Sequence, residues 1–455
     1  MRLGKKPLLK RSFGFMSLLG FSCAVLITWE GILVTSIGAL LNGGPAGVVW
    51  GFLIVLLGTM STFATIGELA SMAPVSGGQY HWVAIMASAS CRNFLSYITA
   101  WVTVFGWHRF LARFEGAVLV LHLVGFFCVL ILMVYLGPHA SAKEVQGLSF
   151  LVGMPSSVFC LMGADSAVHM SEEIISAATV VPKALMYSII INGALAWAMV
   201  IAMIFCIGDL EAALGATKTV FYPFVEIFYQ AVNSRAGAAI MASIILVMSI
   251  ASIVGVYAAS SRMLWSFARD RGVPFHECLV KLTKRISLPI YTVLVTLLFS
   301  MLLALIPLGS SVAFNNIISL SVAGLYASYL IVAALLLWRR VRGEMQPFST
   351  SSTPISSPDN LCWGPWKIPE PLGTINNAFA CVYLLFIWFW SFWLPSTPTT
   401  PETMNFSVLV FGATVLFSIV YYYVFKGRMA FTGPVQEVEV GTMEDLQVCK
   451  DAEER

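Results

Sequence analysis

Two carboxylates lie inside long apolar segments of this sequence, and each has a glycine close by. Asp165 follows Gly163 by two residues in a run that begins near residue 148, and Glu30 directly precedes Gly31 in the first apolar segment. A carboxylate near the middle of a bilayer costs about 2.5–3.5 kcal/mol on insertion scales, so it needs a partner or a water-filled cavity. Glycine, like Pro155 earlier in the run of Asp165, permits a membrane helix to break where the backbone is buried in protein or lines a cavity.

Broken helices that carry an acid near the midplane are typical of secondary transporters, which place them at corresponding positions of two inverted repeats. Half-helix N-termini attract anionic substrate groups, and Glu30 or Asp165 would face the cationic end of a substrate. Trp29 would offer an aromatic face to an ammonium group. We therefore expect a substrate site made of Thr28, Trp29, Glu30, Gly31, Gly163, Ala164 and Asp165.

Each of these features also has a simpler explanation. Asp165 would lie near the water interface if its helix were unbroken, and Trp29 would then be an ordinary aromatic residue facing lipid or core. Three further acids, Glu68, Glu172 and Glu173, are candidates for a gate or a proton relay. Glu68 is otherwise a helix residue at the cytosolic end of the second apolar segment, and the other two are otherwise surface charges.

The remaining residue types give no support to an enzyme or a metal protein. The nine cysteines are scattered without a CxxC pair, and His81, His108, His122 and His169 show no pairing at i, i+4 and no HExxH pattern. No nucleophile elbow, kinase motif set or dinucleotide-binding fingerprint is present. We expect no catalytic residue, no cofactor, no bound metal and no nucleic-acid partner.

The elements that must position the acids are membrane helices. Of the 455 residues, 58% are hydrophobic and 11% are charged, whereas soluble domains carry about 25% charged residues. Residues 94–107 form a stub, because they give only about 21 Å of helix against a hydrocarbon core of roughly 30 Å. Ten other runs are long enough to span: residues 14–40, 47–70, 115–136, 148–170, 184–207, 236–260, 290–307, 312–338, 376–395 and 405–425.

Ten spans place both termini on the same side of the membrane. If that side is the cytosol, only Lys143, Lys218 and Arg235 lie in outside loops, and all other lysines and arginines lie inside. This sorting requires the stub to enter and leave on the cytosolic side or to lie at the interface. We therefore predict that both termini are cytosolic.

The division of the chain follows from these spans. Residues 14–338 form the expected transporter core, with a shortened first repeat at 14–136 and a second repeat at 148–338. The flanking parts are a cytosolic N-terminus at 1–13, a cytosolic linker at 343–375, the last two transmembrane helices at 376–425 and an acidic cytosolic tail at 426–455.

Several short motifs between residues 13 and 433 together resemble the fungal branch of the amino acid–polyamine–organocation superfamily, the permeases for GABA, choline and other amino acids. The motifs are Thr28-Trp29-Glu30-Gly31, Gly67-Glu68-Leu69-Ala70-Ser71-Met72-Ala73-Pro74, Gly77-Gly78-Gln79-Tyr80, Gly163-Ala164-Asp165, Ser171-Glu172-Glu173, Ser261-Arg262-Met263-Leu264-Trp265, Phe267-Ala268-Arg269-Asp270-Arg271-Gly272 and Ser287-Leu288-Pro289.

The resemblance implies an all-α polytopic fold of twelve helices, built from inverted five-helix repeats. It places the substrate site between the broken first and sixth helices, at residues 28–31 and 163–165, and it implies coupling to protons. A small amine-bearing solute such as an amino acid, GABA or choline is the expected substrate, and the plasma membrane or the vacuolar membrane is the expected location.

The sequence departs from the family at Trp107-His108-Arg109-Phe110, where the third helix runs almost directly into a segment resembling the start of the fifth. Residues 14–136 hold three full spans and residues 148–338 hold five, although inverted repeats should match. Ten full spans and a stub therefore replace the expected twelve helices. The alternative function is a shortened paralogue or mis-spliced product that does not transport and acts as a receptor or partner, or is inert.

Overall fold

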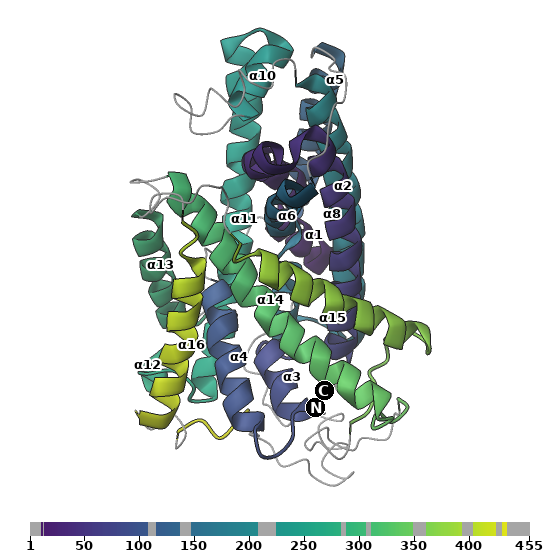
Figure 1. The fold of residues 1–455 in the computed structure, drawn as a ribbon. Helices are drawn as coiled ribbons and strands as arrows, with labels where there is room; N and C mark the ends of the chain where they lie inside the picture. Colours follow the sequence, from purple (N-terminus) through teal and green to yellow (C-terminus); the bar gives the residue numbers. More distant parts are fainter. Residues whose placement is uncertain are drawn as a thin grey trace, which may run out of the picture.

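The computed structural model of the chain is helical throughout the parts that it describes (Figure 1). The structure describes residue 11 and residues 13–107, 115–136, 147–207, 224–283, 288–305, 311–348, 361–393, 404–424 and 430–434. The predicted N-terminal segment and acidic tail lie almost wholly outside these residues, as do His108, Arg109 and the middle of the predicted linker.

The first half of the chain contains the following helices: α1 (Phe15–Leu26), α2 (Thr28–Met72), α3 (Gln79–Met86), α4 (Arg92–Gly106) and α5 (Glu115–Leu136). The second half contains α6 (Gly147–Leu161), α7 (Ser166–His169), the 3₁₀ helix η1 (Ser171–Glu173), α8 (Ala177–Cys206), α10 (Phe224–Val232), α11 (Arg235–Arg269), α12 (His276–Leu279), α13 (Ile290–Leu305), α14 (Ser311–Val341), α15 (Leu372–Trp390) and α16 (Ser407–Val424).

The first membrane segment is broken, as expected, but at a different residue. Ile27 adopts a left-handed backbone with φ 36° and ψ 50°, which ends α1 and begins α2. Thr28–Gly31 form the first turn of α2, so the break lies directly before these four residues. A second change of direction occurs inside α2 at Gly44, whose φ is 62°, followed by Pro45.

The second expected break lies after Leu161. Gly163 has a φ of 111°, which glycine adopts freely because it has no Cβ, and the four-residue helix α7 follows. Pro155 does not end the helix, since α6 continues through it for a further turn. The unbroken-helix explanation for Asp165 is therefore wrong, and Asp165 is buried inside the protein.

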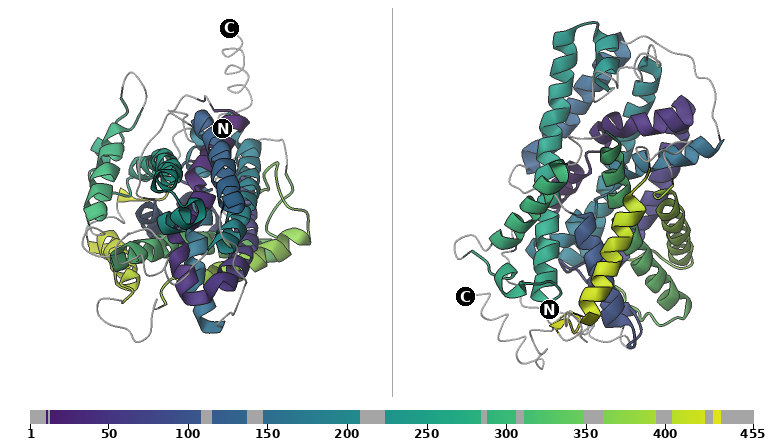
Figure 2. Two further views of the ribbon diagram at one scale, coloured as in Figure 1. Left: turned by 90° about the horizontal axis from the view of Figure 1, so that it is seen from above. Right: turned by 60° about the vertical axis from the view of Figure 1, so that its left-hand side comes forward.

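The core is built around the long helix α2, which packs along α6 and α8 (Figure 1). Figure 2 shows α11 on a different side of the molecule from α2. Helix α16 lies beside α4. Helix α15 packs on α14 and α2, and α4 packs on α3, α14 and α16. Segments from both halves of the chain therefore surround the two helix breaks.

Most of the predicted spans correspond to helices with similar bounds. Within the described residues, seven helices are long and apolar enough to cross a membrane, and two shorter apolar helices cover His122–Met133 and Ile290–Leu302. The chain is thus a polytopic all-α membrane protein. The predicted stub is helix α4, which packs on α3, α14 and α16.

Candidate functional site

The two helix breaks lie against each other in the interior. A Cβ atom on Gly163 would lie 3.5 Å from Val25 at the end of α1, and one on Gly31 would lie 3.2 Å from the sulfur of Cys160 in α6. The hydroxyl of Ser252 in α11 donates to the carbonyl oxygen of Val25 at 3.0 Å, which satisfies one backbone group freed by the first break. The sequence prediction that residues 28–31 and 163–165 come together is consistent with this geometry.

Asp165 sits at the second break with donors from two other helices around one of its oxygens. The amide nitrogen of Gln79, the first residue of α3, donates to Oδ2 at 2.7 Å, and the indole nitrogen of Trp107, directly after α4, donates to the same atom at 3.3 Å. All three residues are buried. Oδ2 of Asp165 therefore accepts two hydrogen bonds from the protein itself.

His169 at the end of α7 completes this group. Its Nδ1 lies 2.8 Å from the carbonyl oxygen of Ser76, and its Nε2 lies 3.7 Å from Oδ2 of Asp165. Gly78 has a φ of 52°, and a Cβ atom there would lie 3.1 Å from the imidazole ring. The glycine therefore allows the chain before α3 to fold closely over His169.

Glu30 lies in the first turn of α2 and faces α5. Its Oε1 is 2.8 Å from Nδ1 of His122, and both side chains are fully buried. The rings of His122 and Phe126 lie against Trp29, at centroid distances of 6.0 and 5.9 Å. Within the described part of the chain, Oε2 of Glu30 and Nε2 of His122 have no hydrogen-bond partner.

The other residues expected in the site are buried close to these acids. Thr28 donates from its hydroxyl to the side-chain oxygen of Asn192 in α8 at 3.1 Å. Trp29 is fully buried, so it does not face lipid, and Ala164 is fully buried beside Gly163. The expected site residues therefore share one interior region, where Glu30 and Asp165 have different partners.

Glu172 and Glu173 are not free surface charges, because each pairs with an arginine of α11. Oε1 of Glu173 accepts from Nε of Arg262 at 2.8 Å, and Oε2 of Glu172 accepts from Arg269 at 3.3 Å. The backbone of Phe13 also pairs with this segment, donating to the carbonyl of Glu173 at 3.1 Å. The segment after the second break is thus fastened to both α11 and the chain before α1.

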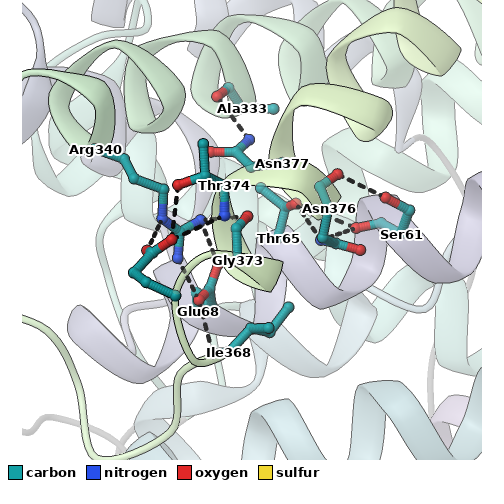
Figure 3. Close-up of polar contacts among 11 residues, drawn as sticks. Ser61, Thr65, Glu68, Ala333, Arg340, Ile368, Gly373, Thr374, Asn376 and Asn377 are labelled. Carbon is teal, nitrogen blue, oxygen red and sulfur yellow. Dashed lines mark hydrogen bonds and ion pairs between the residues drawn. The ribbon is translucent and has the colours of Figure 1, made fainter.

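Glu68 is the most firmly held of the expected acids (Figure 3). Its carboxylate is fully buried and accepts from both terminal nitrogens of Arg340 in α14, at 2.7 and 3.1 Å. The backbone N–H of Ile368 also donates to it at 2.9 Å. Arg340 additionally donates to Glu370 at 2.7 Å and lies 4.5 Å from the ring centre of Trp363.

Glu68 thereby fixes residues 361–371, which we name the docked connection, against the end of α2. Trp366 donates its backbone N–H to the hydroxyl of Ser71 at 2.9 Å, and Leu361 and Trp363 are buried. A Cβ atom on Gly364 would lie 2.3 Å from the carbonyl carbon of Ser71, so only glycine permits this approach. This part of the predicted linker is packed structure, and Glu68 is more than a helix-end residue.

Sequence reasoning missed five residues that the structure brings to these acids: Gln79, Trp107, His122, His169 and Arg340. A polar or basic residue inside or at the end of an apolar run was the available signal, and the Gly77-Gly78-Gln79 motif pointed to one of them. No group of three or more metal-ligating side chains occurs among residues that the structure describes.

The chain matches known membrane permeases. The sequence model of a family described as "Amino acid permease" matches residues 13–112 and 108–414. A "Choline transporter" of Saccharomyces cerevisiae is 25% identical over 93% of this chain and 83% of that protein. The "Amino-acid permease BAT1" of Arabidopsis thaliana is 25% identical over 96% of this chain and 95% of that protein.

A solved structure gives a weaker likeness. The crystal structure of a manganese transporter of Eremococcus coleocola, in complex with an aromatic bis-isothiourea substituted compound, aligns with a TM-score of 0.43 at 15% identity. The alignment covers 91% of this chain and 94% of that chain. The two family matches meet at residues 108–112, the place where the sequence departs from the expected helix order.

Proposed function

The chain belongs to the amino acid permease family, and we propose that it is a proton-coupled secondary carrier for a small amine-bearing solute, such as an amino acid, GABA or choline. Members of this family are transporters and not enzymes, and the chain is a multi-pass membrane protein. The names of the relatives, a choline transporter and an amino-acid permease, support this substrate class.

One observation carries the proposal: two fully buried acids, Glu30 and Asp165, lie beside two adjacent helix breaks. A buried carboxylate is costly unless it is paired, so acids at such positions are retained for substrate or ion binding. Each acid keeps one oxygen without a hydrogen-bond partner among the described residues. A substrate or a proton can therefore be accepted at each of them.

The two acids divide these roles in the proposal. Glu30 binds the ammonium group, because Trp29 and Phe126 place aromatic rings beside it and a cation is attracted to such rings. His122 holds the carboxylate until the substrate arrives. Asp165 belongs to the proton-binding site, since protein donors hold its Oδ2 in place of a substrate cation and its Oδ1 has no hydrogen-bond partner among the described residues.

The ion pairs at the arginine-rich end of the molecule serve as the inner gate in this proposal. We define this end by Arg262, Arg269, Arg339 and Arg340. In the closed gate, Glu172 and Glu173 form ion pairs with arginines of α11, and Glu68 forms an ion pair with Arg340 of α14. We propose that the arginine-rich end and both termini face the cytosol, as the positive-inside rule predicts. The plasma membrane or the vacuolar membrane is the proposed location.

Uptake of labelled choline, GABA and a panel of amino acids into cells expressing the chain tests the proposal. Accumulation that follows an imposed proton gradient and is absent from cells with an empty vector is the expected result. A matched chain with two helices restored between Trp107 and Phe110 serves as the positive control. Transport by that chain, with none by the natural chain, would reject the proposal for this product.

A second candidate, a shortened protein that does not transport, is supported by the unequal halves of the chain and by the two family matches that meet at residues 108–112. Stable protein that binds choline or an amino acid without flux would favour a receptor or partner. Rapid degradation would favour an inert product. Genomic DNA between the codons for Trp107 and Phe110 that encodes about two more membrane helices, or roughly 50 apolar residues, would identify a splicing error.

A further inference from the structure

We propose that His169 and Asp165 hold the coupled proton together, with His169 as the group that binds it while the site is closed. This inference rests on the proposed proton coupling. It names a residue outside the two stretches that the sequence indicated.

The protonation of one imidazole nitrogen follows from its partner. Nδ1 of His169 lies 2.8 Å from the carbonyl oxygen of Ser76, and a carbonyl oxygen can only accept. Nδ1 therefore carries a hydrogen and donates it to Ser76. A neutral imidazole has one N–H, so in the neutral form Nε2 would present a lone pair.

That lone pair would face a carboxylate. Nε2 of His169 lies 3.7 Å from Oδ2 of Asp165, and both side chains have 0% exposure. The same oxygen also accepts from Gln79 and Trp107, so it presents only lone pairs to the imidazole. Two facing lone pairs in a buried site repel each other, whereas a second proton on Nε2 converts the contact into an ion pair.

The surroundings hold the imidazole in this position. The ring of Trp107 meets the ring of His169 edge-on at a centroid distance of 5.5 Å and an angle of 85°. Gly78 also lies against this ring, since a Cβ atom there would be 3.1 Å from a ring carbon of His169. His169 is thus fixed between α3 and the end of α4 with its Nε2 aimed at Asp165.

Other titratable groups near the pair are few among the residues that the structure describes. The phenols of Tyr326 and Tyr329 in α14 interact with Asp165. Glu172 and Glu173, which follow α7, are paired with Arg269 and Arg262 of α11. The other neighbours are Val25 of α1, Ser76 in the chain before α3 and Gln79 of α3, which do not titrate in the physiological range.

The proton balance is simple. On closure the pair takes one proton from solvent, which becomes the Nε2 hydrogen of the His169 imidazolium. When the segment carrying α7 moves away from α3 and α4, the pair is exposed on the other side and the proton returns to water. An uncompensated carboxylate in the closed site is disfavoured, so closure and proton binding are linked.

Transport measurements in vesicles that contain the purified chain test this role, with choline and GABA as probes. One proton per substrate allows about tenfold accumulation for each pH unit of gradient. We expect His169→Gln to retain exchange of labelled for unlabelled probe but to lose accumulation, so that its ratio falls to about 1. His276→Gln on α12 is the matched control and should accumulate like the natural protein.

Nitrogen-15 NMR of histidine-labelled protein provides a readout that does not depend on transport. We expect an imidazolium signal at pH 7 that disappears in His169→Gln and becomes a neutral imidazole in Asp165→Asn. That result in a chain without transport would support the shared proton and reject the proposed carrier function. A neutral His169, or gradient-driven accumulation that survives in a folded His169→Gln protein, would overturn the inference.

Discussion

The indole nitrogen of Trp107 donates to Oδ2 of Asp165 over 3.3 Å, so the shortened helix α4 ends on the carboxylate at the second helix break. The sequence departs from its family directly after this residue. The contact with Asp165 lies on the N-terminal side of the departure. The part of the third helix that contacts Asp165 is therefore still present in this chain.

Trp107→Phe tests the value of this contact. The change keeps an aromatic ring against His169 but removes the N–H, and a hydrogen bond to a charged group is worth about 1.5–3 kcal/mol. We expect gradient-driven accumulation of choline or GABA to fall, with roughly a 10-fold change in the half-saturating proton concentration. Trp101→Phe on the same helix is the control, since Trp101 packs on Phe267 and Phe417. Equal effects of both changes would deny the indole nitrogen a specific role.

Asp165→Asn and Glu30→Gln should have complementary effects if the acids divide their roles as proposed. Glu30→Gln loses a charge-assisted contact to the ammonium, so binding should weaken by about 10- to 150-fold. Asp165→Asn should still exchange substrate across the membrane but no longer concentrate it. Uptake, exchange and pH dependence are measured for both variants in the natural chain and in the chain with restored helices. Two variants that behave like their parent would make both acids peripheral.

Glu68→Gln should destabilise the folded protein. Removing one partner of a buried ion pair leaves the other charge uncompensated, which costs roughly 3–5 kcal/mol. The thermal unfolding midpoint of the detergent-purified variant should fall, and Arg340→Met combined with Glu68→Gln should recover part of the loss. Glu277→Gln on α12 is a control for loss of an exposed acid. An unchanged midpoint for Glu68→Gln would contradict the role of this pair.

Gly78→Ala should disturb His169 as well as the backbone. The backbone of Gly78, with φ 52° and ψ −119°, lies in a region that residues with a Cβ rarely adopt, so the substitution costs roughly 1–3 kcal/mol. Gly343 is a control, because its φ is also positive, at 68°, but nothing lies within 4 Å of an added Cβ. Both variants should lose stability, whereas only Gly78→Ala should alter the pH dependence of uptake. Identical pH profiles would show that the imidazole position does not depend on this glycine.

We expect Glu370 to stabilise the folded protein at neutral pH and to lose this effect in acid. Partial burial would raise the pKa of its carboxyl, but hydrogen bonds from Thr374 and the charge of Arg340 outweigh burial and hold the pKa below the ordinary value of 4.5. A lowered pKa gives stability that is present above pH 4.5 and is lost as the pH falls below it. Unfolding midpoints between pH 3 and 7 should therefore decline less in Glu370→Gln than in the natural protein. Parallel curves would contradict this linkage.

Hydropathy was sufficient to predict the order and approximate extent of the membrane helices. Helix α5 has the predicted bounds, 115–136, and α13 begins at the predicted residue. The position of the first break was not predictable, because Ile27 is a poor residue for left-handed backbone and the nearby Gly31 pointed elsewhere. The packing of neighbouring helices imposes this backbone conformation on Ile27. That packing cannot be predicted from the residues close to Ile27 in the sequence.

The acids themselves were predictable and their partners were not. A charge in an apolar run is visible in the sequence, but His122 lies 92 residues from Glu30 and Arg340 lies 272 residues from Glu68. Such pairs depend on how distant helices cross. The docked connection was missed for the same reason. The predicted linker that contains it, residues 343–375, has a Pro- and Ser-rich composition typical of a linker, whereas buried residues of the docked connection contact α2.

The docked connection also determines where this chain can accept foreign sequence. Connections between membrane helices are usual places for an epitope or a fluorescent domain, because loops tolerate added length. An insertion within residues 361–371 would have to pull Leu361 and Trp363 out of the core and part Ile368 from Glu68. It would shift the register of α15 against α14 as well. We therefore expect this loop to tolerate an inserted reporter poorly, although its composition resembles that of a linker.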